Sequence, residues 1–597
     1  MSTSIEFLTT MGKMAGMLQF LKNHQWALVL AFIASIIISY PQISLRYDNR
    51  DVYQGVEILG GIGDERAWLS RVREAYDGHP SISNAYFKEG KNDPYLFQPL
   101  GSVIIAYLGK LFSLDINNTL LLFRLLFPFS VFLLIYGFLL FFTKEKLVAL
   151  TTSAFLFFGN TIFSRNALFS MLSGDPPSPY YLNYTRPVNP LMTSFFFYGF
   201  LLCFLLFLDA STRLSVKKQW IWGVASTLML GLSFYDYFYT WTFLYSFLGV
   251  LILIFLFQKK WQDIKRIGLV LLGSLLIAVP YLWNLYRATT YLTYSEVGQR
   301  HGLIETHAPV LGFLVPLLFI FFLLFFPRAW KERYYFALAL VIAPFIVLNQ
   351  QIITGKVLQY AHYHWNYHLA LAMIFLSIIF FSWVSKTNWR MLKKTSAILI
   401  IVVSIFTGFW VQSSSYAVNK ELVIDRQRYG APLNWLSQNA VKDEVVFSDN
   451  ETARLIVIYT PLNVFYHSSA RYSLAATTER LTNTLFLYYR LNGVSGNEAQ
   501  EVFFKDREDI SWAIYGIYYR DIAGGYEKIP DEILLDLVGK YQESFMVDNS
   551  TFFKEMLQKY QVKYLVWDKR DYPLWNLEQY QFLRKITELG DFVIYQI

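Results

Sequence analysis

The chain has 597 residues, of which 54% are hydrophobic, 19% aromatic and 16% charged; soluble domains carry roughly 25% charged residues, so an ordinary soluble protein is excluded. The net charge of +8 does not indicate nucleic-acid binding, because most Lys and Arg residues lie in short loops between apolar runs, where they report membrane topology. The single cysteine, Cys203, lies in an apolar run, which excludes a disulfide framework and a Cys-based metal site.

About eleven apolar runs are predicted to span the membrane, since a span needs roughly 20 mainly apolar residues. They begin near Trp26, Thr119, Leu147, Pro190, Trp220, Tyr239, Ile267, Val310, Tyr335, Tyr367 and Thr395. A further run, 99–114, is short and is interrupted by Gly101, Gly109 and Lys110. It is predicted to form a helix that lies against the bundle. No cleavage site follows the first span, which is expected to be a retained signal anchor.

The positive charges predict the orientation of these spans. Basic residues concentrate in alternate loops, namely 143–146, 211–219, 258–266, 327–333 and 385–394. Because cytoplasmic loops carry an excess of Lys and Arg, these loops and the N-terminus are expected in the cytoplasm. The opposite loops are expected on the extracytoplasmic side; they are 44–118, 164–189, 235–237, 284–309 and 349–365. The membrane itself is expected to be the plasma or inner membrane of the cell.

The composition becomes that of a soluble domain from about residue 413. Strands are predicted at 444–448, 455–459, 562–567 and 592–597, and helices at 530–545 and 551–560. This alternation predicts a small extracytoplasmic α/β domain with a supporting or acceptor-binding role. The fold class is therefore an α-helical polytopic membrane protein with about eleven spans over 1–412, followed by an α/β domain over 413–597.

The first external loop contains an acidic pair, Asp64 and Glu65. Trp68, Val72 and Tyr76 follow at helical spacing, which predicts an amphipathic helix on the membrane surface. As a helix cap and a first-turn acid, the pair would merely stabilise this helix. An external acid at a helix start can also accept a proton from a hydroxyl or coordinate a divalent cation.

The other external loops supply Asp175, as a second acid, and a set of polar residues predicted to bind substrate. This set comprises Arg186, Asn189, Tyr235, Asp236, Arg300, His301, Gln351, Lys356, His362 and His364. The planar guanidinium of Arg186 suits a phosphate, although contact with lipid headgroups would explain any single arginine equally well. For the polar residues of the loop at 349–368, the alternative to substrate binding is aromatic packing at the membrane interface.

Three local features resemble the GT-C superfamily of membrane glycosyltransferases, which includes oligosaccharyltransferases, protein O-mannosyltransferases and aminoarabinose transferases. They are Gly63-Asp64-Glu65 with the helix after it, Gln98-Pro99-Leu100 ahead of a second surface helix, and the segment 186–190. The resemblance implies a polyprenyl-phosphate-linked sugar donor, chemistry on the outer face, and a GT-C-like membrane domain. It also implies that Asp64 corresponds to the catalytic acid of the first loop and Asp175 to that of the second.

The resulting hypothesis is a glycosyltransferase that acts on a lipid, glycan or protein acceptor. Asp64 is the general base, and Glu65 orients the acceptor or helps to hold a metal. Arg186, with Arg300 or His362, neutralises the leaving phosphate. Asp64 and Asp175 are the expected ligands if a divalent ion, Mg²⁺, Mn²⁺ or Zn²⁺, takes part.

Two alternatives belong to other functional classes. A lipid-linked-glycan transporter or flippase would place ionisable residues within its spans and would show internal repeats. The spans hold few such residues, with Arg124 and Asp209 near span ends, and the sequence contains no evident repeat. A non-catalytic protein of envelope-glycan assembly remains the second alternative.

Overall fold

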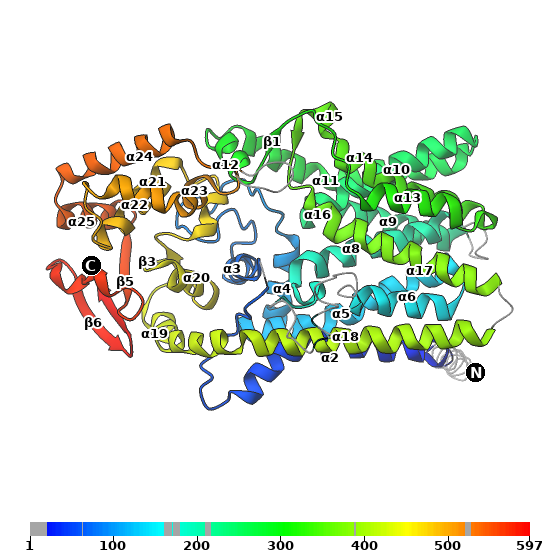
Figure 1. The fold of residues 1–597 in the computed structure, drawn as a ribbon, viewed down its shortest axis with the longest axis horizontal. Helices are drawn as coiled ribbons and strands as arrows, with labels where there is room; N and C mark the ends of the chain where they lie inside the picture. Colours follow the sequence, from blue (N-terminus) through cyan, green and yellow to red (C-terminus); the bar gives the residue numbers. More distant parts are fainter. Residues whose placement is uncertain are drawn as a thin grey trace, which may run out of the picture.

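The computed structural model describes residues 21–62, 64–159, 180–208, 216–386, 390–519 and 527–597, together with positions 19, 170 and 173. Figure 1 shows an elongated molecule with a helical bundle at one end and a smaller domain of helices and strands at the other. The long helix α18 (Arg390–Asp425) runs along the bundle and joins the two parts.

All eleven predicted apolar runs form helices. The other ten are α2 (Gln25–Asp48), α5 (Ile116–Thr143), α6 (Lys146–Phe158), α8 (Thr193–Leu208), α9 (Val216–Asp236), α10 (Phe238–Phe257), α11 (Trp261–Thr289), α13 (Leu314–Phe325), α14 (Glu332–Asn349) and α17 (Leu369–Lys386). Within the described part of the chain, eight helices are long and apolar enough to cross a membrane. The helices α6, α9 and α13 are not among the eight, and α6 and α13 have only 13 and 12 residues.

Short elements connect the long helices. They are α3 (Glu65–Tyr76), α4 (Leu100–Leu111), α12 (Tyr294–Arg300), α15 (Gln351–Thr354), α16 (Ala361–Tyr363), the 3₁₀ turns η2 (Asn183–Thr185) and η4 (Arg328–Trp330), and the π-helical segments η3 (Pro187–Met192) and η5 (His364–His368). A two-residue strand, β1 (Ile304–Glu305), pairs antiparallel with β2 (Lys356–Val357). The 12 residues of α4 span about 18 Å, too short to cross the membrane. As predicted, α4 packs against the bundle, on α5 and α9.

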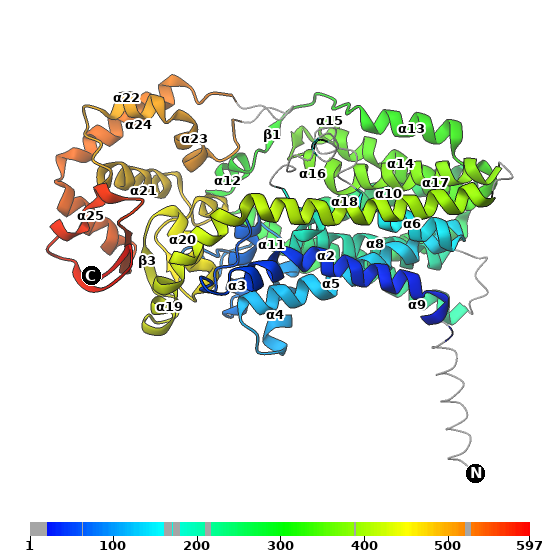
Figure 2. The ribbon, with the colours of Figure 1, turned by 60° about the horizontal axis from the view of Figure 1, so that its bottom comes forward.

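The helix α18 crosses the predicted domain boundary at 412/413 without a break. Its 36 residues measure about 54 Å, well beyond the roughly 30 Å of a bilayer core, so one end extends past the membrane. Figure 2 shows it passing from the bundle to the smaller domain, where η6 (Arg426–Tyr429) and α19 (Gly430–Asn439) follow. The two parts are therefore joined by a continuous helix.

The C-terminal domain contains a five-stranded sheet of order β4-β3-β5-β7-β6. The strands are β3 (Val445–Phe447), β4 (Asn463–Val464), β5 (Val562–Asp568), β6 (Arg584–Leu589) and β7 (Phe592–Gln596); β4, β3 and β5 are parallel, and β7 runs antiparallel to β5 and β6. The remaining elements are α20 (Asn450–Tyr459), η7 (Ser468–Tyr472), α21 (Thr478–Leu491), α22 (Ala499–Lys505), α23 (Arg507–Tyr515), α24 (Asp531–Glu543), η8 (Ser544–Met546), α25 (Asn549–Lys559), η9 (Pro573–Trp575) and η10 (Leu577–Gln579).

One predicted strand, 455–459, is wrong, because these residues form the second half of α20. The apolar, β-branched run favours a strand, but in a run this short the pattern cannot distinguish a strand from a buried helix. The residue at the start of α20 favours the helix. The side chain of Asp449 accepts hydrogen bonds from the backbone N–H groups of Glu451 and Thr452, at 2.9 Å each, and caps α20. The other predicted strands and helices of this domain are present.

The first external loop packs into the C-terminal domain. Helix α3 lies between α4 of the bundle and α20. The backbone N–H of Val464 in β4 donates to the carbonyl of Tyr86 at 2.8 Å, and the backbone N–H of Glu57 is 2.8 Å from the hydroxyl of Tyr459. One hydrophobic core contains buried residues of both parts, from Ala27 to Ile594. The interface is therefore fixed by packing as well as by hydrogen bonds.

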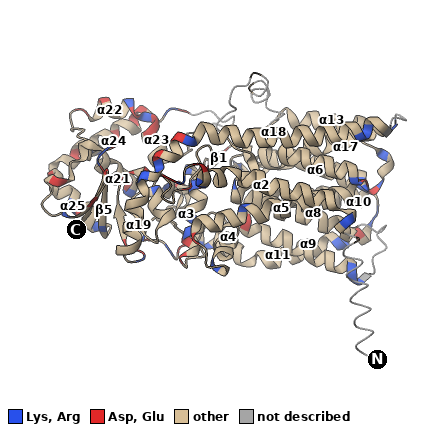
Figure 3. Ribbon diagram, turned by 90° about the horizontal axis from the view of Figure 1, so that it is seen from below, with Lys and Arg blue, Asp and Glu red and all other residues tan. Residues whose placement is uncertain are grey.

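Figure 3 shows where the charges of the bundle lie. Lys and Arg residues gather at the end of the bundle that is remote from the C-terminal domain. The loops around 143–146, 258–266 and 327–333 contribute to this end. The basic loops that the sequence assigns to one side of the membrane thus share one end of the molecule.

We expect Gly109→Val to destabilise the protein by about 1–3 kcal/mol, because it overpacks the contact between α4 and α5. A Cβ at Gly109 would lie 2.1 Å from the Oγ1 atom of Thr119. Thermal unfolding of the detergent-purified protein measures the loss. The control is Gly249→Ala in α10, where a Cβ meets nothing within 4 Å and the higher helix propensity of Ala should be neutral or stabilising. Equal melting temperatures for both variants would contradict the packing argument.

Candidate active site

Asp64 and Arg186 form an ion pair that joins the first and second external loops. Asp64 precedes α3 but its side chain caps no backbone N–H there. Its Oδ2 instead accepts a hydrogen bond from Nη2 of Arg186 at 2.6 Å, and the two side chains are 61% and 30% exposed. The Nε atom of Arg186 is buried and has no hydrogen-bond partner among the described residues. The exposed carboxylate of Asp64 is therefore the group available to a ligand.

Glu65, the neighbour of Asp64, is buried and forms an ion pair with Arg124 of α5, which is equally buried. Arg124 also donates to Oε1 of Gln42 at 3.1 Å and to the carbonyl of Thr185 at 3.4 Å. Burial raises the pKa of Glu65, since desolvation outweighs the attraction of the guanidinium. Glu65 lies inside the protein fold rather than on the exposed surface that Asp64 occupies.

This network extends further along the first span. Gln42 donates to Glu57 at 2.5 Å, and Nη2 of Arg46 donates to the same carboxylate at 3.0 Å. The hydroxyl of Tyr53 donates to Glu57 as well. None of these residues was predicted to have a role, and Arg124 was predicted only to be a charge near a span end. The position of Arg124 within an apolar run could have indicated this network, because charged residues in spans are usually paired with other polar groups.

Three predicted loops meet beside the Asp64–Arg186 pair. Nδ2 of Asn189 donates to the hydroxyl of Tyr237 at 2.7 Å, and that hydroxyl lies 2.5 Å from Nδ1 of His362. The Tyr237 hydroxyl is within electrostatic reach of both Arg186 and Asp64. The predicted residues Asn189 and His362 therefore belong to one hydrogen-bonded group, linked by Tyr237, which was not among the predicted residues.

Asp236 and Tyr235 lie at the end of α9, with different surroundings. Asp236 is 1% exposed, and neither carboxylate oxygen has a hydrogen-bond partner among the described residues. A Cβ at Gly101 would lie 3.2 Å from its Oδ1, so Asp236 lies against the start of α4. Tyr235 donates to the carbonyl of Ile277 at 2.8 Å, which ties α9 to α11.

Arg300 is occupied by the C-terminal domain. Its guanidinium donates to the carbonyl of Ala476 at 2.5 Å, to the hydroxyl of Thr478 at 2.7 Å and to Glu296 at 2.9 Å. Arg300 is 2% exposed. The structure therefore places it as a link between α12 and the C-terminal domain, without a free donor aimed at Asp64.

The remaining predicted residues lie in other surroundings. Gln351 is buried and donates to the carbonyl of Ala308 at 3.0 Å. Lys356 is exposed in β2, 3.5 Å from Glu305 of β1. The ring of His364 lies edge-on to the adjacent Trp365, with centroids 5.0 Å apart. None of these contacts connects the three residues to the Asp64–Arg186 pair.

The described residues contain no group of three or more His, Cys, Asp or Glu side chains that could hold a metal ion. Asp175, the second acid predicted from the sequence, lies outside the described residues. Asp64 offers a metal only one carboxylate, which Arg186 already holds. The described donors therefore do not form a metal site on their own, and metal use by Asp64 and Asp175 stays a prediction.

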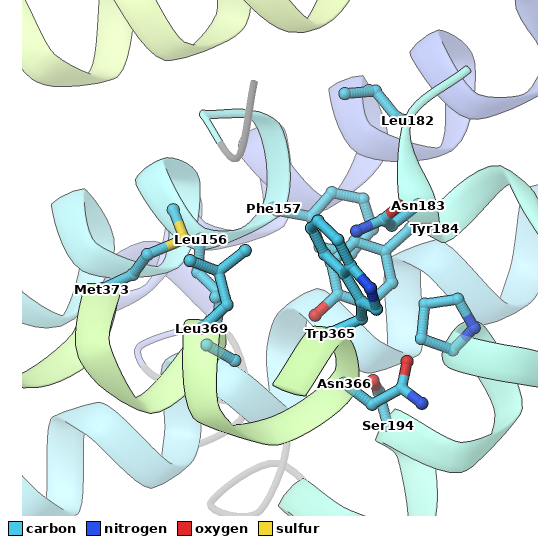
Figure 4. Close-up of a pocket in the computed structure, with 12 residues that line it drawn as sticks. Leu156, Phe157, Leu182, Asn183, Tyr184, Ser194, Trp365, Asn366, Leu369 and Met373 are labelled. Atoms are coloured by element: carbon cyan, nitrogen blue, oxygen red, sulfur yellow. The ribbon is translucent and has the colours of Figure 1, made fainter. Parts of the chain in front are cut away.

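A mostly apolar pocket is lined in part by residues 182–184, which precede Arg186 in the second loop. Its lining residues come from α6, from the segment 182–194 and from the region of η5 and α17: Leu156, Phe157, Leu182, Asn183, Tyr184, Pro190, Ser194, Trp365, Asn366, Leu369, Ala370 and Met373. Figure 4 shows Trp365 and Tyr184 close together, with the side chains of Asn183 and Asn366 nearby. This pocket could not be predicted from the sequence, because its walls come from three separate segments.

Fold and site together define an integral membrane protein with a C-terminal α/β domain and an acid–arginine pair near its junction with the bundle. No protein-family model matches the sequence, and no curated protein is significantly similar to it. Solved structures similar to this chain include an oligosaccharyltransferase from Archaeoglobus fulgidus tethered with an acceptor peptide (14% identity over 92% of this chain and 70% of that one, TM-score 0.48). They also include ArnT from Cupriavidus metallidurans bound to undecaprenyl phosphate (12% identity over 96% and 98%, TM-score 0.47).

We expect Glu65→Ala to lower the stability of the protein by about 3–5 kcal/mol, because it leaves the buried Arg124 without its carboxylate. The measurement is the melting temperature and the yield of monodisperse protein in detergent. Asp64→Ala is the matched control, since its ion pair is exposed and contributes at most about 1 kcal/mol. If the two variants were equally stable, the assigned difference between the neighbouring acids would be incorrect.

We expect the stability of the protein to depend on His301 at acidic pH. Burial, together with the nearby guanidinium groups of Arg71, Arg471 and Arg300, lowers the pKa of His301 to about 4. The unfolded chain takes up this proton near pH 6.5, so the contribution is complete above that pH and is lost progressively as the pH falls towards 4. The melting temperature of His301→Gln should therefore fall less than that of the wild type over this range. Parallel curves would refute the assignment.

Proposed function

We propose that the protein is a GT-C-type glycosyltransferase that moves a sugar from a polyprenyl-phosphate-linked donor to an acceptor hydroxyl on the outer face of the membrane. The observation that carries the proposal is the exposed carboxylate of Asp64, held by Arg186 at 2.6 Å. A carboxylate base and a guanidinium suited to phosphate are what the transfer of a sugar from a lipid phosphate requires.

The bond changes in this proposal follow from the geometry of the pair. Asp64 accepts the proton of the acceptor hydroxyl while that oxygen attacks the anomeric carbon. The bond between the anomeric carbon and the phosphate oxygen breaks, and polyprenyl phosphate leaves with the bonding electrons. Arg186 donates to this phosphate through the guanidinium that holds Asp64 at 2.6 Å. Competition between the phosphate and Asp64 for the guanidinium would free the carboxylate when the donor binds.

The neighbouring residues have supporting roles in the proposal. Tyr237 and its partners Asn189 and His362 hydrogen-bond the sugar or the phosphate. We assign Glu65 as a positioning residue, because its carboxylate is buried on Arg124 and does not reach an acceptor. No step is routed through a metal.

The proposed orientation follows the charges. The basic end of the bundle, remote from the C-terminal domain, faces the cytoplasm by the positive-inside rule. Asp64, the first external loop and the C-terminal domain then lie on the extracytoplasmic side. Lipid-linked sugars exposed on that face would be the donors, and a lipid, glycan or protein would be the acceptor.

We expect Asp64→Asn to reduce glycosyl transfer by about 10²- to 10⁴-fold, because the amide cannot accept the proton of the acceptor. The measurement is mass spectrometry of lipids and glycans from cells that lack the gene and are complemented with either form. The product present in wild-type cells identifies sugar and acceptor, and its loss reports the variant. Asp77→Asn, at the other end of α3 and paired with Arg73 at 2.7 Å, is the control that should retain transfer. Near-normal product with Asp64→Asn would refute the role of Asp64 as base.

A further inference from the structure

Among the described residues, two arginines at the junction of α3 and the C-terminal domain form no ion pair with a carboxylate. Arg71 of α3 is 9% exposed, and its guanidinium lies 3.7 Å from the ring centroid of Phe97. Arg471 of η7 is 2% exposed, and its Nε and Nη1 atoms have no hydrogen-bond partner in the part of the chain that the structure describes. Neither guanidinium forms an ion pair within the described part of the chain. Their electrostatic free energy in this position is unfavourable unless an anion accompanies them.

A cluster of aromatic rings connects the two arginines. The ring of Phe97 lies 4.7 Å from that of His301, which lies 4.6 Å from that of Tyr472. The guanidinium of Arg471 lies 4.8 Å from the ring of Tyr472. Both guanidinium groups act on the charge of His301. Arg71 and Arg471 therefore flank the same histidine from the two sides of the interface.

Two further hydrogen-bond donors in this region are buried and unpaired. The ring of Trp68 lies 4.8 Å from the guanidinium of Arg71, and its indole Nε1 has no hydrogen-bond partner within the described ranges. Nδ1 of His467 accepts a hydrogen bond from the backbone N–H of Ser469 at 2.9 Å, so the proton of the neutral ring lies on Nε2. That Nε2 is also without a partner among the described residues. An indole N–H, an imidazole N–H and a guanidinium are thus left unsatisfied here, and such donors are the complement of an oxyanion.

The nearby carboxylates are already bonded to other cations. Glu451 accepts from Arg66 at 2.8 Å, from Arg454 at 3.1 Å and from Arg426 at 3.2 Å. Glu296 holds Arg300 at 2.9 Å, and Asp64 holds Arg186. The region therefore has an excess of positive charge, and the described carboxylates do not neutralise Arg71 and Arg471.

We infer that Arg71, Arg471, Trp68 and His467 form an oxyanion-binding site that takes a phosphate or carboxylate group of a substrate. Guanidinium groups, an indole N–H and an imidazole N–H bind oxyanions through charge-assisted hydrogen bonds. Arg71 is within electrostatic reach of Asp64. An acceptor that bears an anionic group would thus be held with its hydroxyl near Asp64. This use of the site rests on the proposed function, whereas the binding of the anion does not.

The test is the affinity of the purified full-length protein for inorganic phosphate, measured by thermal shift in detergent against chloride at equal ionic strength. We expect phosphate to stabilise the wild type. Arg71→Gln and Arg471→Gln should each weaken its binding by about tenfold or more, since each removes hydrogen bonds from a charged donor. Arg73→Gln is the matched control on α3, because Arg73 is paired with Asp77 at 2.7 Å, and it should bind phosphate like the wild type.

Two results would overturn the site: a wild type that responds to phosphate and chloride alike, or undiminished binding in both Arg71→Gln and Arg471→Gln. The variants should fold, because each removes an unpaired buried charge, and their melting temperatures without phosphate should equal or exceed that of the wild type. Arg71→Lys, which keeps the charge and loses the planar fork, should bind phosphate with intermediate affinity.

A parallel titration with polyprenyl phosphate identifies the source of the anion. If Arg71→Gln weakens the binding of inorganic phosphate but not of polyprenyl phosphate, the site takes the anionic group of the acceptor. If it weakens both equally, the site takes the phosphate of the lipid carrier. Both titrations work without glycosyl transfer. Loss of transfer activity in Asp64→Asn and loss of phosphate binding in Arg71→Gln are therefore separate results, and either proposal can fail alone.

Discussion

The geometry of the candidate site depends on the guanidinium of Arg124. This buried group binds Glu65, Gln42 and the carbonyl of Thr185. Asp64 directly precedes Glu65, and Arg186 directly follows Thr185 in the sequence. One charged group therefore sets the positions of the carboxylate and the guanidinium that we assign to chemistry. Because a buried charge is stable only with its partners in place, this arrangement tolerates little displacement.

Asp64 and Glu65 are adjacent at the start of α3 but have different surroundings and different assigned roles. Successive residues of an α-helix point about 100° apart, so Glu65 can enter the protein interior while Asp64 faces solvent. Glu65 is 1% exposed and the side chain of Asp64 is 61% exposed. A carboxylate that must take up a proton from a substrate needs access, whereas one that positions a helix benefits from burial and a fixed partner.

The C-terminal domain contributes to the site through its interface with the first external loop. Helix α3 packs on α20, and α18 continues from the bundle into this domain. Arg471 of η7 and Arg71 of α3 consequently approach the same aromatic cluster. Neither part of the molecule contains the oxyanion site alone. A rigid junction is therefore a structural requirement of the inferred site, and the shared hydrophobic core supplies it.

The sequence by itself determined the membrane-bundle class, the helix after Asp64, the short helix α4 and the α/β character of the C-terminal domain, because hydrophobicity and periodicity are local properties. Tertiary structure alone decided which polar groups meet: Glu65 pairs with a residue 59 positions away, and Tyr237 with one 125 positions away. It also decided the state of 455–459, where a cap and packing produce a helix from a strand-like run. Such pairings depend on how helices pack, and no local pattern encodes that distance.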